Sequence, residues 1–169
     1  FGPLFLADTT VNFNPSAEEI VEITELAAKQ VGKFNIKPRI ALITYSNFGS
    51  AEGDDAKKMK KAVQILKERN PKMIVDGEIQ AHLPFNLDLL KENHPFSDLA
   101  NEGANVLIFP NLSSSNIAYN LVKEVAGIEK IGPILLGLKK PVHVLQLGSS
   151  TREIVNMIAI AVVDAQMSK

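Results

Sequence analysis

The chain of 169 residues contains no cysteine. Disulfides, thiolate nucleophiles and cysteine-based metal sites are therefore excluded. The formal net charge is only −1, which argues against a general nucleic-acid binder, because such proteins carry a basic surplus. The longest apolar run, residues 158–163, is far shorter than the roughly 18 residues that span a bilayer. We expect a cytoplasmic protein without nucleic-acid or membrane partners.

Metal-binding spacings are also missing. The histidines, His82, His94 and His143, follow no recognised ligand pattern, and the sequence suggests no carboxylate partner for them. Asp76 and Glu78 alternate just beyond a predicted strand, a position suited to polarising a group or binding a cation, but no further ligands accompany them. We predict no metal site and ordinary structural histidines.

Hydrophobic residues make up 46% of the chain and charged residues 22%, which is typical of a globular domain with a sizeable core. Apolar periodicity predicts strands and helices in alternation. The predicted strands are 40–45, 73–76, 105–109 and 141–145, with 131–137 as an apolar connector or short edge strand. The predicted helices are 16–32, which opens on a Ser16–Glu19 capping box, 54–70, 87–92, 116–125 and one that follows Ser150.

This alternation predicts an α/β three-layer α/β/α sandwich with a mainly parallel sheet. In such sheets ligands bind beyond the carboxyl ends of the strands. The last helix is different, because residues 154–163 are apolar nearly all the way round, and such a helix must be covered on several sides. We expect it to pack on a missing domain or on a partner subunit.

Two polar loops follow predicted strands. The loop Ser46-Asn-Phe-Gly-Ser50 combines hydroxyls with a glycine close to a helix start, which suits either a phosphate cradle or a plain turn. The stretch from Asn111 through Ser115 to Asn116 offers side-chain donors, either as helix caps or as ligand contacts.

A third polar loop precedes the last helix. Ser150-Thr-Arg-Glu153 fits a capping box, in which Ser150 is the N-cap and Glu153 reaches back to it. The alternative function of Glu153 is that of a general base beside an anion site.

The chain resembles the phosphotransacetylase (phosphate acetyltransferase) family. The resemblance is carried by Val75-Asp-Gly-Glu-Ile-Gln80, Ala104-Asn-Val-Leu-Ile-Phe-Pro-Asn-Leu112, Ile131-Gly-Pro-Ile-Leu135 and Lys140-Pro-Val142, among other segments. It covers essentially the whole chain but only the C-terminal half of the family's chain. It implies that 1–139 form an α/β domain and that 140–169 form a strand, loop and helix returning to an absent N-terminal domain.

The family resemblance also implies a ligand, acetyl-CoA or CoA, bound in a cleft whose other wall belongs to that absent half. The residues expected to contact the ligand are Ser46, Gly49, Ser50, Asn111, Ser115, Asn116, Gly148, Ser149 and Ser150.

A closer resemblance is to the phosphotransacetylase-like domain that follows the catalytic part of large bacterial NADP-dependent malic enzymes. It rests on Ser46-Asn-Phe-Gly-Ser50, Pro141-Val-His143, Ile154-Val-Asn-Met157 and Ala161-Val-Val-Asp164. It implies a regulatory, acetyl-CoA-responsive module that mediates homodimers or larger assemblies.

The last loop departs from the transferase pattern. Active transferases carry Ser-Arg before the glycine of this loop and an aspartate six residues after the arginine, and here the three positions hold Gln146, Leu147 and Glu153. Leucine makes no charge-assisted bonds to an oxyanion, and losing one such donor costs about a hundredfold in rate. Glu153 keeps a carboxylate on a longer arm. Arg152 is the only arginine near the loop and is the one candidate to replace the lost arginine.

Three hypotheses follow. The first is an inactive, acetyl-CoA-binding regulatory and oligomerisation module of a malic enzyme. The second is an active phosphate acetyltransferase that interconverts acetyl-CoA and phosphate with acetyl phosphate and CoA. The third is a dimerisation domain with an empty cleft.

Overall fold

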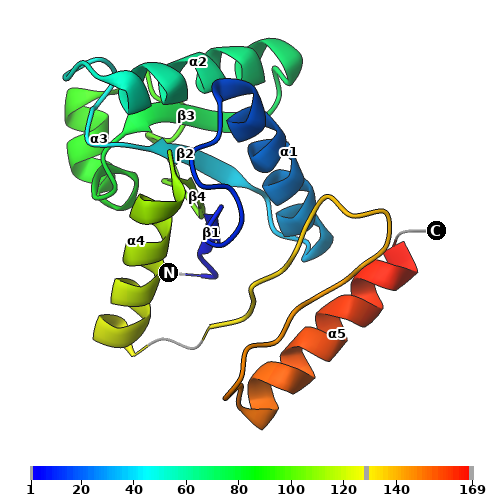
Figure 1. The fold of residues 1–169 in the computed structure, drawn as a ribbon. Coiled ribbons are helices and arrows are strands. Elements are labelled where there is room, and N and C mark those ends of the chain that lie inside the picture. The colour runs from blue at the N-terminus through cyan, green and yellow to red at the C-terminus, as the bar shows by residue number, and fades with distance from the viewer. Residues whose placement is uncertain (1, 128–129, 168–169) are drawn as a thin grey trace. The chain divides into compact units, whose positions relative to one another are not determined.

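The computed structural model describes residues 2–127 and 130–167. Its strands are β1 (Phe5–Ala7), β2 (Arg39–Ile43), β3 (Ile74–Ile79) and β4 (Val106–Ile108). Its helices are α1 (Ala17–Lys33), α2 (Asp54–Arg69), α3 (Leu87–Asn93), α4 (Leu112–Ala126) and α5 (Thr151–Met167), with the 3-10 turn η1 (Leu83–Phe85) (Figure 1). The chain divides into two compact units, residues 1–117 and 118–169, so that α4 crosses the division.

The first unit is built on a single four-stranded sheet of order β1-β4-β2-β3. Every neighbouring pair is parallel, and Val106 of β4 lies opposite both Phe5 of β1 and Ile40 of β2. Because all strands run the same way, their carboxyl ends lie at one edge of the sheet. The loops after β1, β2, β3 and β4 therefore begin at the same edge.

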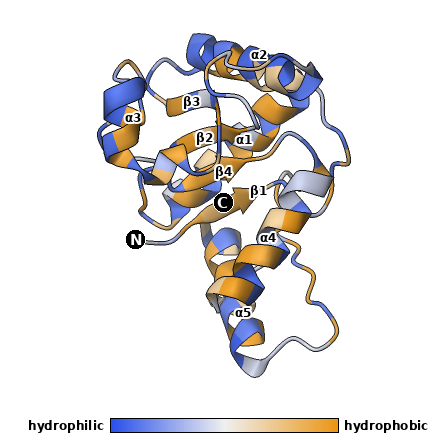
Figure 2. Ribbon diagram, turned by 90° about the vertical axis from the view of Figure 1, so that its left-hand side faces the viewer, coloured by the Kyte–Doolittle hydropathy of each residue, from blue (hydrophilic) through white to orange (hydrophobic). Residues whose placement is uncertain are grey.

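Both faces of the sheet are covered. On one face, Ile20 of α1 and Leu66 of α2 join Ile40 in a single buried cluster. The residues that alternate with this set along the strands, such as Ala41 and Leu107, are buried as well. In Figure 2 most of the strand ribbon accordingly has the colour of hydrophobic residues, except for part of β3, whose sequence includes Asp76, Gly77 and Glu78. The predicted α/β class with a parallel sheet is confirmed.

The two helix starts that were predicted from capping boxes, those of α1 and α5, are confirmed. Ser16 caps α1, its Oγ accepting from the N–H of Glu19 at 3.2 Å while its own N–H donates to Glu19 Oε2 at 2.7 Å. The matching box at the start of α5 has the same form, with Ser150 N–H to Glu153 Oε2 at 2.7 Å and Glu153 N–H to Ser150 Oγ at 3.2 Å. Each box satisfies two donors that a helix start otherwise leaves unpaired.

Several predicted boundaries are wrong. The segment 141–145 is extended but is not a strand. A strand exists only through hydrogen bonds to a neighbour, and among the described residues this segment has none. Of the two alternatives for 131–137, the structure shows the connector and not the edge strand. The short strand β1 was not predicted. Helix α4 begins at Leu112 rather than 116, because Asn111 caps it four residues earlier than expected.

The second unit holds the end of α4, the extended segment 130–150 and α5. Of the 17 residues of α5, only Met157, Ile160 and Asp164 are buried. Apolar side chains on its remaining surface, including Val155, Ile158 and Val162, are exposed. Within the described ranges, no helix is long and apolar enough to cross a membrane.

Candidate functional site

Loop 46–50, residues Ser46–Ser50, leaves the carboxyl end of β2 and leads towards α2. Ser46 is fully buried, whereas Gly49 and Ser50 are exposed. Gly49 has a φ of 93° and Phe48 one of 49°, so the loop turns through two consecutive residues with positive φ. For Phe48 this is an uncommon conformation, which the surrounding contacts must enforce.

The backbone N–H groups of this loop all donate within the protein. Asn47 N–H donates to Ser50 Oγ at 2.8 Å, and Ser50 N–H to the Asn47 carbonyl at 3.0 Å. Phe48 N–H donates to the carbonyl of Glu78 at 2.8 Å, and Gly49 N–H to its Oε1 at 2.5 Å. In this conformation an incoming phosphate would meet side chains of the loop rather than a cradle of free N–H groups.

Glu78 is the residue around which the loop is built, and the sequence did not single it out for this role. Its Oε1 also accepts the hydroxyl of Ser46 at 2.9 Å. Glu78 and Asp76 both lie inside β3 rather than beyond it, and both are buried. The sequence did contain one indication of an unusual role, because two acidic residues alternate within an otherwise apolar strand.

The turn after β1 lies at the same edge of the sheet. Asp8 accepts the backbone N–H groups of Thr10, Val11 and Asn12 at 2.8–3.0 Å, and also the Asn12 side-chain amide at 2.7 Å. Partial burial raises the pKa of Asp8, but the hydrogen bonds from these backbone N–H groups outweigh it and bring the pKa below its ordinary value.

The polar stretch after β4 is largely used for capping. Asn111 Oδ1 accepts the N–H of Ser114 at 2.9 Å, and its Nδ2 donates to Asp55 Oδ2 at 3.0 Å. Ser115 is fully buried and its hydroxyl lies 3.1 Å from the carbonyl of Asn111. Asn116 is exposed and its side-chain amide donates to the carbonyl of Thr9 at 3.4 Å. Of the three predicted contacts Asn111, Ser115 and Asn116, only Asn116 is exposed.

In the second unit, two of the residues that depart from the transferase pattern, Gln146 and Leu147, lie in the loop before α5, and the third, Glu153, lies in the first turn of α5. Leu147 is completely exposed, and no side chain lies within 4 Å of the position that a Cβ would take at neighbouring Gly148. The hydroxyl of Ser149 donates to the carbonyl of Gln146 at 2.8 Å. The loop is thus a tight turn with an apolar side chain in solvent.

Glu153 is occupied by its capping role. Its Oε2 accepts the Ser150 N–H, and its Oε1 lies 3.4 Å from Lys130 Nζ. The hydrogen bond from the Ser150 backbone, supported by the Ser150 hydroxyl and by Lys130, lowers the pKa of Glu153. A lowered pKa makes a carboxylate a weaker base.

The sequence suggested no carboxylate partner for His143, but the structure shows one. Its Nε2 lies 3.3 Å from Oδ2 of Asp164 in α5, and both side chains are buried. The two residues are far apart in sequence, so no spacing rule could have paired them. Among the described residues, no cluster of three or more histidine, aspartate or glutamate side chains is placed to hold a metal ion.

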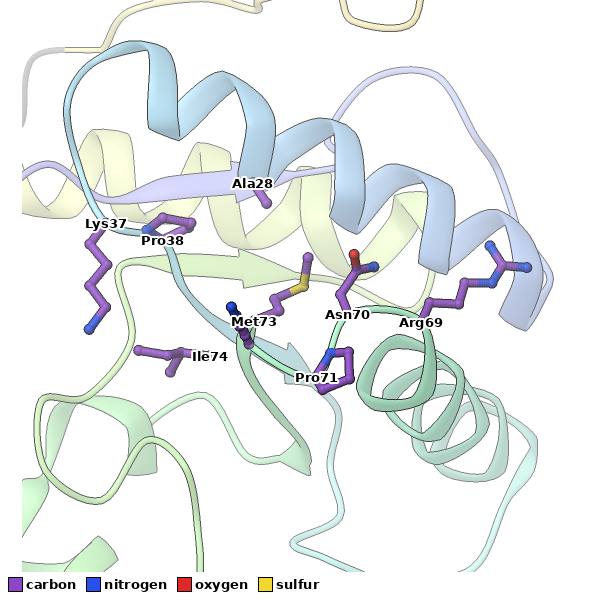
Figure 3. A pocket seen from close by; sticks show the side chains of 9 residues that line it. Ala28, Lys37, Pro38, Arg69, Asn70, Pro71, Met73 and Ile74 are labelled. Carbon is purple, nitrogen blue, oxygen red and sulfur yellow. The ribbon is translucent and has the colours of Figure 1, made fainter.

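A cleft of about 520 Å³ lies in the first unit, lined by residues around the amino ends of β2 and β3 (Figure 3). Pro38 and Met73 contribute to its apolar lining, and the cations Lys37, Arg69 and Lys72 also line it. Arg69 stands in the last turn of α2, where a cation complements the negative end of the helix dipole. That role explains the charge without a ligand, so we assign none here.

Comparison with known proteins identifies the relatives of this fold. The chain is 47% identical over 165 residues to the NADP-dependent malic enzyme of Haemophilus influenzae, covering 98% of this chain and 22% of that protein. It is 40% identical over 166 residues to the phosphate acetyltransferase of Clostridium acetobutylicum, covering 50% of that protein. The chain therefore spans about a fifth of one relative and half of the other.

A solved structure agrees with these sequences. The phosphotransacetylase from Streptococcus pyogenes superimposes with a TM-score of 0.86 at 34% identity, over 96% of this chain and 48% of that one. The sequence model of the phosphate acetyl/butaryl transferase family matches residues 2–162. The chain belongs to the phosphate acetyl/butaryl transferase family and is homologous to the C-terminal region of malic enzymes.

Proposed function

We propose that this chain is the C-terminal phosphotransacetylase-like domain of an NADP-dependent malic enzyme. It has lost transferase catalysis and serves as an acetyl-CoA-binding regulatory and oligomerisation module in the cytoplasm. The observation that carries the proposal is the loop before α5, where Leu147 stands in solvent at the position that the family resemblance gives to an arginine. The 47% identity to a malic enzyme supports the choice of parent protein.

Loss of catalysis follows from the chemistry of that position. An arginine fork neutralises a phosphoryl oxyanion through paired, charge-assisted hydrogen bonds, and a leucine side chain makes none. Removing one well-placed donor costs roughly a hundredfold or more in rate. A dianionic substrate such as acetyl phosphate depends on such a cation at least as strongly.

Glu153 supports the same conclusion, because it is poorly placed to act as the general base. Deprotonation of a CoA thiol needs a carboxylate that is free to approach it, whereas both oxygens of Glu153 are engaged by Ser150 and Lys130. The lowered pKa of Glu153 further weakens it as a proton acceptor. In this proposal Glu153 is a helix cap that keeps the shape of the loop.

Ligand binding does not need these groups. The exposed residues Gly49, Ser50 and Asn116 in the first unit remain candidate contacts for acetyl-CoA. So do the exposed Gly148 and Ser150 and the partly buried Ser149 in the second unit. Each set offers hydroxyl, amide or backbone groups, which bind a ligand's phosphates or amides without activating its thiol. The other wall of the cleft would come from an N-terminal phosphotransacetylase-like half.

Oligomerisation is proposed from α5. Its exposed Val155, Ile158 and Val162 form part of an apolar surface, and such surfaces are normally covered by another domain or subunit. Either a preceding half of the same chain or a second copy would remove it from water. Differential affinity of acetyl-CoA for two quaternary states would then change malate oxidation in the attached catalytic domain.

The direct test is acetyl-CoA formation from acetyl phosphate and CoA by the full-length protein. We expect no turnover above the rate of a variant in which Glu153 is changed to alanine. A rate comparable with that of the Clostridium acetobutylicum phosphate acetyltransferase, measured beside it, would refute loss of catalysis. It would establish the second candidate, an active phosphate acetyltransferase, which the 40% identity to that enzyme favours.

A further inference from the structure

Glu78 occupies an irregular position in β3. Along the ladder between β2 and β3, Leu42 lies opposite Gly77, but the next residue, Ile43, lies opposite Ile79. Glu78 is thus an extra residue on its strand. Such a bulge re-aims the side chain of the inserted residue, and bulges are common next to functional sites. Gly77 is required here, because a Cβ at this position would lie 2.6 Å from the carbonyl oxygen of Leu42.

The re-aimed side chain is directed at loop 46–50. One oxygen, Oε1, takes the Ser46 hydroxyl at 2.9 Å and the Gly49 N–H at 2.5 Å, and the backbone carbonyl of Glu78 takes the N–H of Phe48. Glu78 therefore contacts three of the five residues of the loop. Its contacts explain how Phe48 and Gly49 are both held at positive φ.

This arrangement is costly for the free energy of folding. Glu78 is only 1% exposed, and its second oxygen, Oε2, has no hydrogen-bond partner among the described residues. Burying a carboxylate oxygen without a donor is unfavourable, and each such group in a native protein calls for a reason. Apolar packing supplies none, because a leucine would fill the same space without this cost.

We propose that Glu78 is a positioning residue of the acetyl-CoA site. Its side chain accepts hydrogen bonds from the inward-facing donors of loop 46–50 and fixes the loop with Gly49 and Ser50 on the surface. The ligand then meets a preformed loop through exposed groups instead of ordering the loop when it binds. This inference rests on the proposed binding of acetyl-CoA at this loop.

Two readouts on the full-length protein test it: hydrogen–deuterium exchange of a peptide covering residues 45–51, and acetyl-CoA affinity by calorimetry. Glu78→Ala should speed exchange in that peptide and weaken affinity by ~10-fold or more, because ordering a loop on binding reduces affinity. Glu78→Gln keeps an acceptor oxygen in place, so the exchange rate of the peptide and the affinity for acetyl-CoA should both stay close to the wild-type values.

Asp76→Ala is the matched control. Asp76 lies on the same strand and is also buried, and its carboxylate accepts from Lys67, from the N–H of Asp98 and from the N–H of Gly77, none of which belongs to loop 46–50. It should lower the thermal midpoint without speeding exchange in 45–51. If Glu78→Ala does not fold, Glu78→Asp keeps the charge but shortens the reach, and it should loosen the loop in the same way.

The outcomes separate the two proposals. Unchanged exchange and affinity in Glu78→Ala, or equal effects of Glu78→Ala and Asp76→Ala on the loop, would overturn the role of Glu78. Absence of acetyl-CoA binding by the wild-type protein would instead refute the proposed function. In that case the exchange measurement still decides whether Glu78 shapes the loop.

Discussion

The acidic side chains Asp8, Glu78 and Glu153 differ in the donors that their oxygens meet, and this decides what each can do. Asp8 organises an exposed turn through three backbone N–H groups. Glu153 caps a helix. Glu78 holds a loop from the protein interior. None of the three stands free in an open site, as a general base must.

Asp8 should make the free energy of unfolding depend on pH. Hydrogen bonds from backbone N–H groups outweigh its partial burial and lower the pKa of the folded state, so its contribution is present above the unfolded pKa and is lost as pH falls through the folded one. Asp8→Asn should therefore reduce the free energy of unfolding by about 1 kcal/mol at neutral pH. Urea unfolding at pH 7 and in acid measures this difference.

In acid the two proteins should converge, since Asp8 is then protonated in both states of the wild type. Glu22→Gln, at an exposed glutamate away from both ends of α1, serves as the control and should change little at either pH. A gap between wild type and Asp8→Asn that stays constant across the range would rule out this explanation.

The double substitution Leu147→Arg with Glu153→Asp tests whether lost catalysis resides in one loop. If the rest of the cleft survives, it should raise acetyl-CoA formation from acetyl phosphate by about a hundredfold over the wild-type background. Leu138→Arg adds the same charge at another exposed position of the second unit and should give no gain. No gain from the double variant either would place the loss of catalysis elsewhere in the protein.

For single residues, the sequence predicts contacts between side chains that are close together along the chain. Both capping boxes were predicted, because their residues stand three apart and the helix geometry joins them. The ion pair of His143 with Asp164 and the hydrogen bond of Ser46 to Glu78 were not predicted. Both join residues that are distant in sequence and meet only when the chain folds.

Among the elements, α1 offers the clearest test of a local signal. Ser16→Ala removes the acceptor for the Glu19 N–H and should lower the free energy of unfolding by about 1 kcal/mol. The matched control is Ser113→Ala, an exposed serine in the first turn of α4, which should change it by less than half as much. Equal losses in the two variants, measured by urea unfolding, would mean that the Ser16 box contributes nothing specific.

The strands show why element prediction succeeded in the centre of the sheet and failed at its margins. β2 was predictable because it is an apolar run buried on both faces. β1 has only three residues, too few for a periodic pattern. Residues 141–145 are as apolar as a strand, but a strand also needs a neighbouring edge, and the sequence cannot say whether that edge is present.

On the scale of the whole molecule, the chain carries a four-stranded parallel sheet and the helix α5, whose apolar surface is largely exposed. It spans about half of the phosphotransacetylase from Streptococcus pyogenes and 22% of the malic enzyme from Haemophilus influenzae. An N-terminal half would supply both a cover for α5 and the second wall of a ligand cleft. We therefore expect the binding properties of this chain to emerge in the full-length protein.

Regulation by acetyl-CoA is tested by the rate of malate oxidation by the full-length protein as acetyl-CoA is titrated. We expect a saturable change in rate, without any acetyl-CoA consumption, that is weakened in Glu78→Ala and retained in Glu78→Gln. A rate that stays flat up to millimolar acetyl-CoA, in a protein that oxidises malate normally, would contradict the regulatory role.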